Sequence, residues 1–311
     1  MRKVLLFCLL VTALAGSVST AVATTIGVVL PGYSLVFYQV MIKGIEGAAN
    51  DHHVQLLIRS PSDGASLDTS NLQLRMIDYL VRQGVAGIVL APEPLQGEKP
   101  VSIAVPIVLV DRDSADYKGV ATVYTDNFDA GRRAALSLAP VLGKGSRVAV
   151  LRLAPNISST TDRENGFMSV ARKSGWDVVI DTYVGYRPRD AKEAIAKALN
   201  DYAGHLDAVF APAEPVAYGA MQVIEARPDG DRPRLVVFDW RPEFMDALKH
   251  GKIYADLVQD PYRMGYEAIE TLLAALQGHP PHTKIFVDVV TVTPANLNDP
   301  AIHALLQRYG Q

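Results

Sequence analysis

Short apolar runs alternate along the chain with segments whose apolar residues recur every three to four positions. The first run, Thr25–Leu30, ends at Pro31-Gly32, and Phe37, Met41 and Ile45 then follow at helical spacing. The same alternation predicts further strands and helices in the first half of the chain. The strands are Val54–Ile58, Gly87–Leu90, Ile107–Val110 and Val120–Tyr124, and the helices are Leu72–Val81 and Phe128–Leu142. The Pro-rich stretch Glu93–Ala104 predicts a loop or a short helix.

A second set of alternating elements begins at Arg147. Its predicted strands are Arg147–Leu151, Asp177–Thr182, Ala208–Ala211, Leu235–Asp239, Ile253–Val258 and a last one near Ile285–Val292. Its predicted helices are Arg163–Lys173, Asp190–Ala203 with Asp190 as the N-cap, Pro215–Ala226, Pro242–His250 and Met264–Gln277. Repeated strand–helix alternation favours parallel sheets that are covered on both faces. Two such sets predict an α/β protein with two similar lobes.

The N-terminus has the pattern of an export signal. Arg2-Lys3 precedes the apolar core Val4–Ala15, and Ala21-Val22-Ala23 fits the small-x-small cleavage rule. Residues 1–23 are therefore predicted to be a signal peptide, with Thr24 as the mature N-terminus. An uncleaved anchor is the alternative, but the apolar core is short for a membrane span. We expect a soluble periplasmic protein.

Composition excludes several classes of protein. The chain has 311 residues, of which 49% are apolar and 20% charged, so disorder is excluded as the dominant state. A net charge of -3 argues against a nucleic-acid binder, which normally carries a basic excess. The single cysteine, Cys8, lies inside the signal, so neither a disulfide framework nor a cysteine-based metal site is expected.

Motifs for catalysis and cofactors are largely missing from the sequence. It contains neither G-x-G-x-x-G after a strand nor a G-x-S-x-G elbow, and Gly143–Ser146 precedes a strand where a phosphate loop would precede a helix. The scattered histidines, among them His52-His53 and His279, predict no metal site. We expect a protein that is not an enzyme and that uses no cofactor and no metal.

Polar residues follow several of the predicted strands directly. They are Asp111-Arg112, Asp126-Asn127, Asp239-Trp240 and Gln259-Asp260. Ligands of open α/β sheets bind beyond the carboxyl ends of the strands, so these pairs are candidate ligand residues. Turn formation and helix capping are the alternative, which is favoured for Asp126-Asn127. An Asp next to an Arg, as at Asp111-Arg112, offers an acceptor and a donor fork that suit vicinal hydroxyl groups.

Taken in order, these segments resemble the periplasmic sugar-binding proteins of the ribose/galactose type, which are the solute receptors of ABC importers. The resemblance covers nearly the whole mature chain. It is carried by Thr25–Leu30, Phe37-Tyr38, Lys43-Gly44, Pro106–Arg112, Asp126-Asn127, Arg163–Phe167, Ala208–Ala211, Ala217–Ala220, Val236–Asp239, Gly251–Ile253 and Gln259–Gly265.

The resemblance implies a type I periplasmic binding protein: two Rossmann-like lobes with parallel sheets, joined by three crossover strands, that close on a ligand like a hinge. It implies one lobe from residues 24–125 and 260–288 and another from 126–259 and 289–311. The implied ligand residues are Tyr33, Phe37, Tyr38, Asp111, Arg112, Arg163, Asp239, Trp240 and Gln259. For Phe37 and Tyr38 the alternative is core packing, and for Trp240 it is packing over the following helix. Trp176 is expected at the surface of the second lobe.

The sequence also departs from that family's usual pattern. Polar groups are lost at Pro31, Leu35, Thr161 and Ala213, and an aromatic side chain is gained at Trp240. These departures favour a modified, less polar or furanose-like ligand. The leading hypothesis is a monomeric periplasmic receptor that delivers a sugar or sugar-like molecule to the permease of an ABC importer. The alternatives are a ligand-sensing subunit for a membrane histidine kinase or chemoreceptor, and a hydrolase with Asp111 and Asp239 as its carboxylate pair.

Overall fold

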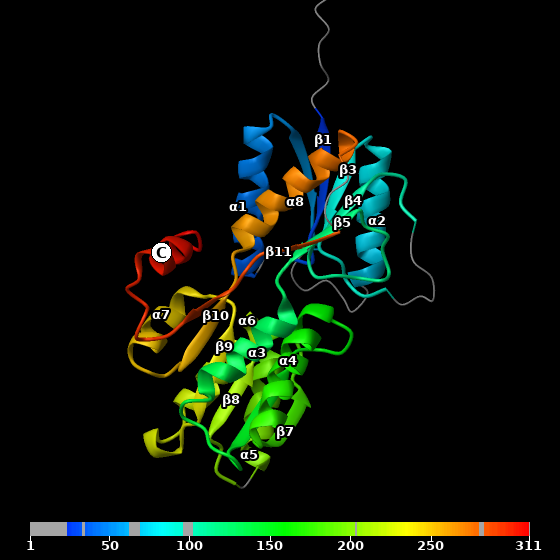
Figure 1. Cartoon of the computed structure of the whole chain (residues 1–311). Coiled ribbons are helices and arrows are strands. Elements are labelled where there is room, and N and C mark those ends of the chain that lie inside the picture. The colour runs from blue at the N-terminus through cyan, green and yellow to red at the C-terminus, as the bar shows by residue number, and fades with distance from the viewer. Residues whose placement is uncertain are drawn as a thin grey trace, which may run out of the picture.

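Two six-stranded sheets, each covered by helices on both faces, form the two lobes of the protein (Figure 1). The computed structural model describes residues 24–32, 35–61, 69–95, 102–202, 204–279 and 283–310. The predicted signal segment 1–23 and the candidate Tyr33 lie outside the described residues. We call the sheet that holds the first strand, with its helices, the first lobe, and the other sheet, with its helices, the second lobe.

The first lobe has a wholly parallel sheet in the order β11-β5-β4-β3-β1-β2. Its strands are β1 (Thr25–Val29), β2 (Gln55–Arg59), β3 (Gly87–Leu90), β4 (Ile107–Asp111), β5 (Ala121–Tyr124) and β11 (Lys284–Phe286). Helices α1 (Val36–Asp51) and α8 (Pro261–Leu276) cover one face, and α2 (Thr69–Arg82) covers the other. The inner strands β1, β3, β4 and β5 are buried on both faces, as a doubly covered parallel sheet requires.

The second lobe repeats this plan in the order β12-β10-β9-β8-β6-β7. Its strands are β6 (Arg147–Arg152), β7 (Asp177–Tyr183), β8 (Ala208–Ala211), β9 (Arg234–Phe238), β10 (Ala255–Val258) and β12 (Val290–Val292). Helices α3 (Asn127–Leu138) and α4 (Ser158–Ser174) cover one face, and α5 (Pro188–Asp201), α6 (Glu214–Glu225), α7 (Pro242–Lys249) and α9 (Pro300–Gln307) cover the other. A short 3-10 turn spans Asp229–Asp231. Strand β12 pairs antiparallel with β10, so this sheet is not wholly parallel as predicted.

The helix that leaves each sheet after its fifth strand packs on the opposite lobe. Helix α3 follows β5 but packs against α4 of the second lobe, and α8 follows β10 but packs against α1 of the first. Asp126 caps α3 by accepting from the Asp129 amide, and Asp260 caps α8 by accepting from the Arg263 amide. The capping alternative for Asp126 is therefore confirmed. With the segment between β11 and β12, the chain passes between the lobes three times.

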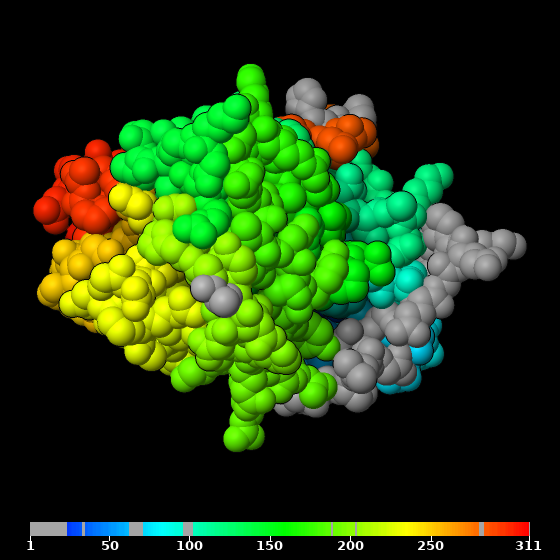
Figure 2. All heavy atoms as spheres, turned by 90° about the horizontal axis from the view of Figure 1, so that it is seen from below, coloured from blue at the N-terminus to red at the C-terminus, as the bar shows by residue number. Residues whose placement is uncertain are grey.

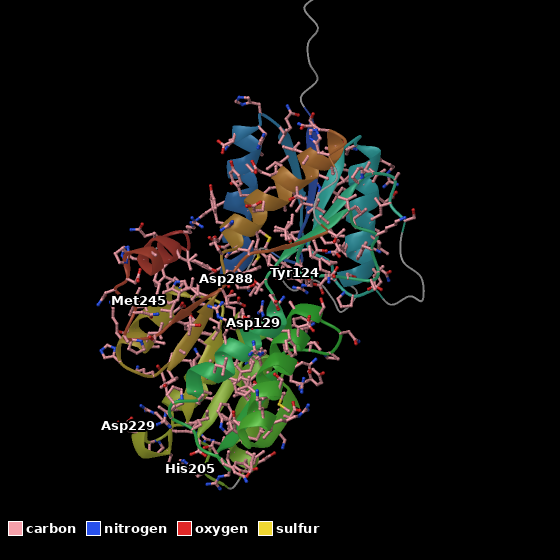
Figure 3. The ribbon with its side chains drawn as sticks, in the orientation of Figure 1. Tyr124, Asp129, His205, Asp229, Met245 and Asp288 are labelled. Atoms are coloured by element: carbon pink, nitrogen blue, oxygen red, sulfur yellow. The ribbon has the colours of Figure 1, made fainter. Side chains whose placement is uncertain are left out.

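The side chains near these connections lie where the two lobes meet. Tyr124, Asp129 and Asp288 surround the junction in Figure 3, whereas His205 and Asp229 lie at the far end of the second lobe. Arg133 of α3 pairs with Asp288 at 2.7 Å. Seen from below in Figure 2, α9 lies at the flank of the second lobe, next to residues of the β9–β10 region. Helix α9 buries Ile302 and Leu306 in that lobe's core.

Several sequence predictions need correction. The predicted helix over 128–142 ends at Leu138, because Pro140 has no backbone N–H to continue the helical hydrogen bonds. Arg187, and not Asp190, is the N-cap of α5, since Pro188 supplies the first helical residue and Asp190 falls in the first turn. The last predicted strand is divided into β11 and β12 by a lobe-to-lobe connection.

Two further features of the fold differ from expectation or were not predicted. Trp176 is buried beside Phe167 in the second-lobe core, not at the surface, because the turn at Gly175 directs the chain back under α4. Helix α9 was not predicted at all. Within the described residues, every helix is too short or too polar to cross a bilayer.

Candidate functional site

Two aspartates with left-handed backbone conformations occupy equivalent positions in the two lobes. Asp111 ends β4 with φ 72°, and Asp239 directly follows β9 with φ 71°. Each of these strands is the third in the order of its sheet. Non-glycine residues rarely adopt this conformation, and where they do, the strain often serves a site. Both side chains are buried where the lobes face each other.

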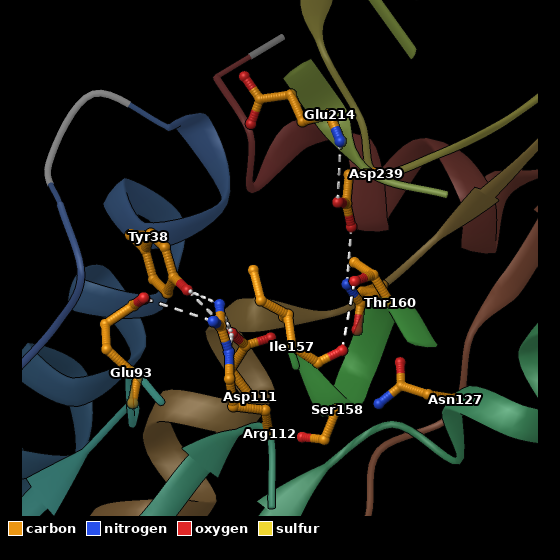
Figure 4. A network of polar contacts seen from close by, with 12 residues as sticks. Tyr38, Glu93, Asp111, Arg112, Asn127, Ile157, Ser158, Thr160, Glu214 and Asp239 are labelled. Atoms are coloured by element: carbon orange, nitrogen blue, oxygen red, sulfur yellow. Dashed lines mark hydrogen bonds and ion pairs between the residues drawn. The ribbon is translucent and has the colours of Figure 1, made fainter. Parts of the chain in front are cut away.

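In the first lobe, Asp111 lies at the centre of a cluster with Tyr38, which is also buried, and with the partly buried Arg112 and Glu93 (Figure 4). The Tyr38 hydroxyl donates to Asp111 Oδ2 at 2.9 Å. Arg112 donates to the same oxygen through Nε at 3.0 Å and Nη2 at 2.9 Å, and to the Tyr38 hydroxyl oxygen at 2.7 Å. Its remaining Nη1 pairs with Glu93 at 3.3 Å. The predicted residues Tyr38, Asp111 and Arg112 are thus brought together.

The electrostatics of this cluster follow from burial. Burial raises the pKa of Glu93 above its ordinary value, although the Arg112 charge opposes the shift. The pKa of the Tyr38 phenol is raised well above its usual range, first by burial and further by Asp111 and Glu93, so the hydroxyl stays protonated and donates. For Arg112, burial lowers the pKa, but Tyr38, Asp111 and Glu93 together outweigh it and raise the net value. The guanidinium is therefore a fixed cation.

In the second lobe, Arg163 of α4 and Asp239 form the matching cluster. Arg163 donates through Nε to Asn127 at 2.8 Å and through Nη1 to the Pro212 carbonyl at 2.9 Å. Its guanidinium lies 3.8 Å from the Phe238 ring centroid and 3.7 Å from Asp239 Oδ2. Gln259 donates to Asp239 Oδ1 at 2.6 Å. The predicted residues Arg163, Asp239 and Gln259 therefore share one network.

Glu214 and Arg241 extend this network. The Glu214 backbone amide donates to Asp239 Oδ2 at 3.2 Å, and Arg241 Nη1 donates to Glu214 Oε1 at 2.9 Å. Burial and, to a lesser extent, the Asp239 charge raise the pKa of Glu214 to about 7, against the opposing effect of Arg241. Burial also raises the pKa of Asp239 itself, although Arg163 opposes this.

The two lobes are in direct contact around these clusters. Ser158, the first residue of α4, donates through its hydroxyl to the Asp113 carbonyl of the first lobe at 2.7 Å. Val40 of α1 belongs to the hydrophobic core of the second lobe. Both aspartates and Arg163 are consequently buried, with Asp111 4% and Arg163 2% exposed, whereas Glu93, Arg112 and Arg241 stay partly exposed. The two lobes are therefore closed on each other around these residues.

The remaining predicted residues lie close to these networks. Phe37 is buried in the first-lobe core and packs edge-on against Tyr38, with ring centroids 5.2 Å apart. Trp240 is fully buried in the second-lobe core, and its indole N–H has no hydrogen-bond partner. The Oε1 atom of Gln259 is likewise buried without a partner. Tyr33 lies outside the described residues.

Sequence reasoning missed Glu93, Glu214 and Arg241. Glu93 and Glu214 each follow the end of a buried strand by three residues, β3 and β8 respectively. The strand-end rule that singled out Asp111 and Asp239 would have found both if it had been extended past the first two residues. Arg241 carries no such signal beyond its place after Trp240. Among the described residues, no group of three or more His, Cys, Asp or Glu side chains is arranged to hold a metal ion.

Comparison with known proteins gives this geometry a context. Residues 26–280 match the periplasmic binding protein domain family. The ribose import binding protein of Bacillus subtilis is 28% identical over 261 residues, which are 82% of each chain. That of Haemophilus influenzae is 23% identical and covers 90% of this chain and 95% of its own.

Solved structures show the same fold. A carbohydrate transporter solute-binding protein from Agrobacterium radiobacter, in complex with D-arabinose, has a TM-score of 0.80 at 27% identity and covers 92% of this chain and 99% of its own. An ABC transporter solute-binding protein from Agrobacterium vitis, bound with α-D-tagatopyranose, also has a TM-score of 0.80, at 23% identity, covering 91% and 98%. The match over residues 26–280 spans most of the chain, and the chain therefore belongs to the periplasmic binding protein domain family.

Proposed function

We propose that this protein is a periplasmic receptor that captures a sugar or sugar-like molecule between its lobes and delivers it to an ABC importer. The main support is the pair of left-handed aspartates, Asp111 and Asp239, each paired with an arginine, on the two sides of the place where the lobes meet. Carboxylates accept from hydroxyl groups and guanidinium forks donate to them, so the two clusters together suit a molecule with several vicinal hydroxyls.

The proposed ligand residues are those predicted from the sequence, with Glu93, Glu214 and Arg241 added. Tyr38 and Arg112 would act from the first lobe, and Arg163 and Gln259 from the second. Phe37 and Trp240 would supply apolar surface for the C–H face of a ring. We also propose that residues 1–23 are a signal peptide. The proposed boundaries between the lobes lie at 125/126, 259/260 and 288/289.

The names of the relatives favour an importer receptor over a sensor subunit, because several of them are ribose import binding proteins. We propose further that the protein acts as a monomer and catalyses no reaction. Asp111 and Asp239 are each engaged with an arginine, which leaves neither placed as a free acid or base for hydrolysis.

The test is a ligand panel on the mature chain. D-ribose, D-arabinose and D-tagatose, with leucine and glutamate as non-sugar controls, are screened by thermal unfolding and then by calorimetry. A sugar that binds only the folded form raises the melting temperature with the logarithm of its concentration. Chromatography after incubation should return the sugar unchanged. A shift with the amino acids alone, or conversion of the sugar, would contradict the proposal.

A matched pair of variants assigns the binding to the cleft. Arg112→Lys keeps the charge but loses the fork that holds Asp111, Tyr38 and Glu93, so the affinity for the best sugar should fall about tenfold or more. Arg82→Lys makes the same change in an exposed pair with Asp78 on α2 and should bind like the parent. Equal affinities for both variants would place the site elsewhere.

A further inference from the structure

The C-terminal tail, residues 293–310, returns to the segment that leads from β10 to α8. The family match ends at residue 280, so this tail lies beyond the matched residues. Its helix α9 packs Ile302 and Leu306 into the second-lobe core. In Figure 1 the red α9 lies on the side of the second lobe that is turned toward the first lobe. The two residues that follow α9, Arg308 and Tyr309, are thereby carried to the crossover between the lobes.

Tyr309 holds the backbone of a candidate ligand residue. Its hydroxyl donates to the Gln259 carbonyl oxygen at 3.1 Å, and both residues are buried. A buried backbone carbonyl requires a hydrogen-bond donor, and this hydroxyl supplies one. Burial raises the pKa of the Tyr309 phenol well above its usual range, and the charges of Asp239 and Asp256 raise it further, so the hydroxyl stays protonated and donates.

The Gln259 side chain passes this constraint on to Asp239. Gln259 directly follows β10, and its Nε2 donates to Asp239 Oδ1 at 2.6 Å. The Asp239 amide also donates to the Leu257 carbonyl of β10 at 3.1 Å. Asp239 has a left-handed backbone with φ 71°, a conformation that persists only where the surroundings hold it. Strand β10 and the residue after it supply two of the contacts that do so.

Arg308 provides a second attachment at the next residue of the crossover. It pairs with Asp260, and its guanidinium lies 5.2 Å from the centroid of the Tyr262 ring. The same Asp260 carboxylate caps α8 by accepting from the Arg263 amide at 3.0 Å. Two consecutive residues of the tail thus bind two consecutive residues of the crossover. A segment held at both points has little freedom to turn Gln259 away from Asp239.

We propose that Tyr309 is a positioning residue of the ligand site: its hydroxyl fixes the Gln259 carbonyl, so that the Gln259 amide holds Asp239 in the orientation that meets a ligand. This inference deepens the proposed function, on which it rests, by adding to the site a residue of the C-terminal tail. Without the hydroxyl, Gln259 samples other orientations. Binding must then order this side chain again, and that cost lowers the affinity.

Tyr309→Phe tests the proposal, because it removes the hydroxyl and keeps the ring in the core. Calorimetry with D-ribose, D-arabinose and D-tagatose should show about fivefold weaker binding, which is the effect of one neutral hydrogen bond. Tyr266→Phe is the matched control, since it removes a hydroxyl that donates at 2.8 Å to Asp51, the last residue of α1. This control should bind like the parent. A purely structural Tyr309 would lower the melting temperature and leave the affinity unchanged, and that result overturns the proposal.

A double-mutant cycle shows whether Tyr309 acts through Gln259. Gln259→Ala removes the side chain that Tyr309 positions but keeps the backbone carbonyl. Adding Tyr309→Phe to Gln259→Ala should therefore cause no further loss of affinity, although each single variant binds more weakly than the parent. Losses that simply add would mean that Tyr309 acts by another route, and the proposal would be wrong.

Nuclear magnetic resonance tests the same contact in the ligand-free mature chain. With glutamine labelled by ¹³C and ¹⁵N, the carbonyl and side-chain amide signals of Gln259 are identified by their loss in Gln259→Ala. Tyr309→Phe should shift both signals, and Tyr266→Phe should shift neither. An unchanged side-chain amide signal in Tyr309→Phe overturns the proposal. Because this measurement needs no sugar, it separates a failure of the positioning role from a failure of the sugar panel.

Discussion

Asp256 is a carboxyl group enclosed in the middle of the second sheet. It lies on β10, it is fully buried, and neither of its oxygens has a hydrogen-bond partner. Burial raises its pKa well above the ordinary value of 3.8, and the charge of Asp239 raises it further. A buried carboxyl without a partner destabilises the fold in its charged form. An apolar side chain at this position should therefore make the fold more stable.

Asp256→Val is therefore expected to stabilise the protein by about 1–3 kcal/mol at pH 8, since Val is apolar and favours strands. The folded state binds the Asp256 proton more tightly than the unfolded state does. The cost of the native residue is therefore largest above its raised pKa and fades as the pH falls toward 3.8. The gain of the variant, measured by urea unfolding, should shrink accordingly between pH 8 and pH 5.

The control for this prediction is Asp177→Val, which makes the same replacement at an exposed position of β7 and should change stability little. If Asp256→Val is less stable than the parent at pH 8, the carboxyl stabilises the fold through a partner, and the argument from its burial is wrong.

Among the helices and strands, two pairs of closely packed helices hold the site in place. In the second lobe, a Cβ added at Gly131 of α3 would lie 1.9 Å from the Arg163 carbonyl oxygen, and one at Gly166 of α4 would lie 2.0 Å from the Phe128 carbonyl oxygen. The first lobe repeats the arrangement between α1 and α8, where a Cβ at Gly44 would lie 1.9 Å from the Tyr262 carbonyl oxygen. The backbones approach so closely that only glycine fits.

Gly131→Ala should thus destabilise the protein by at least about 2 kcal/mol, because α3 and α4 must separate, even though Ala favours a helix over Gly by about 1 kcal/mol. The displacement also moves Arg163, so sugar affinity should fall with stability. Gly219→Ala on α6 is the matched change, because its added Cβ would come closest to the tip of the Ile195 side chain, at 3.1 Å, and would stay 3.5 Å from the Lys192 backbone. Urea unfolding compares the two, and similar losses would refute the close-packing argument.

Comparison of the predicted and observed helices and strands shows what the sequence could and could not predict. Apolar runs placed strands β1 to β10 within two residues, because strands buried on both faces are continuously hydrophobic, but they merged β11 and β12 into one strand. The strand-end rule then located Asp111 and Asp239, since parallel strands bring their carboxyl ends to one edge. Helix α9 was not predicted because it is only eight residues long, although Asp299 and Pro300 form an ordinary helix start.

Contacts between the lobes could not be predicted from the pattern of apolar and polar residues. The Ser158 hydroxyl of α4 bonds to the Asp113 carbonyl of the first lobe, which is 45 residues away in the chain. Nothing in the local sequence around Asp113 records that its carbonyl faces a hydroxyl of the other lobe. The burial of Trp176 is also a tertiary effect, because a single aromatic residue after a glycine does not reveal which way its ring turns.

At the scale of the whole molecule, closure depends on the few polar contacts that span the cleft. The Ser158 hydroxyl donates at 2.7 Å to the Asp113 carbonyl, which lies two residues beyond β4. The bond therefore joins the start of α4 to the first lobe immediately beside the Asp111–Arg112 cluster. In an open form both partners would bond to water, so this contact favours the closed form without adding to the stability of either lobe.

Ser158→Ala is expected to weaken sugar binding about fivefold, since one neutral hydrogen bond contributes about 1 kcal/mol, while the melting temperature of a ligand-free open form stays unchanged. Ser169→Ala removes a hydroxyl from the same helix, where it bonds only to the Gly166 carbonyl at 2.7 Å within α4. This variant should bind like the parent. Calorimetry gives both affinities and scanning calorimetry both melting temperatures. If Ser158→Ala lowers the melting temperature of the ligand-free chain as much as its affinity, the contact belongs to folding, and closure is governed by the clusters on either side of it.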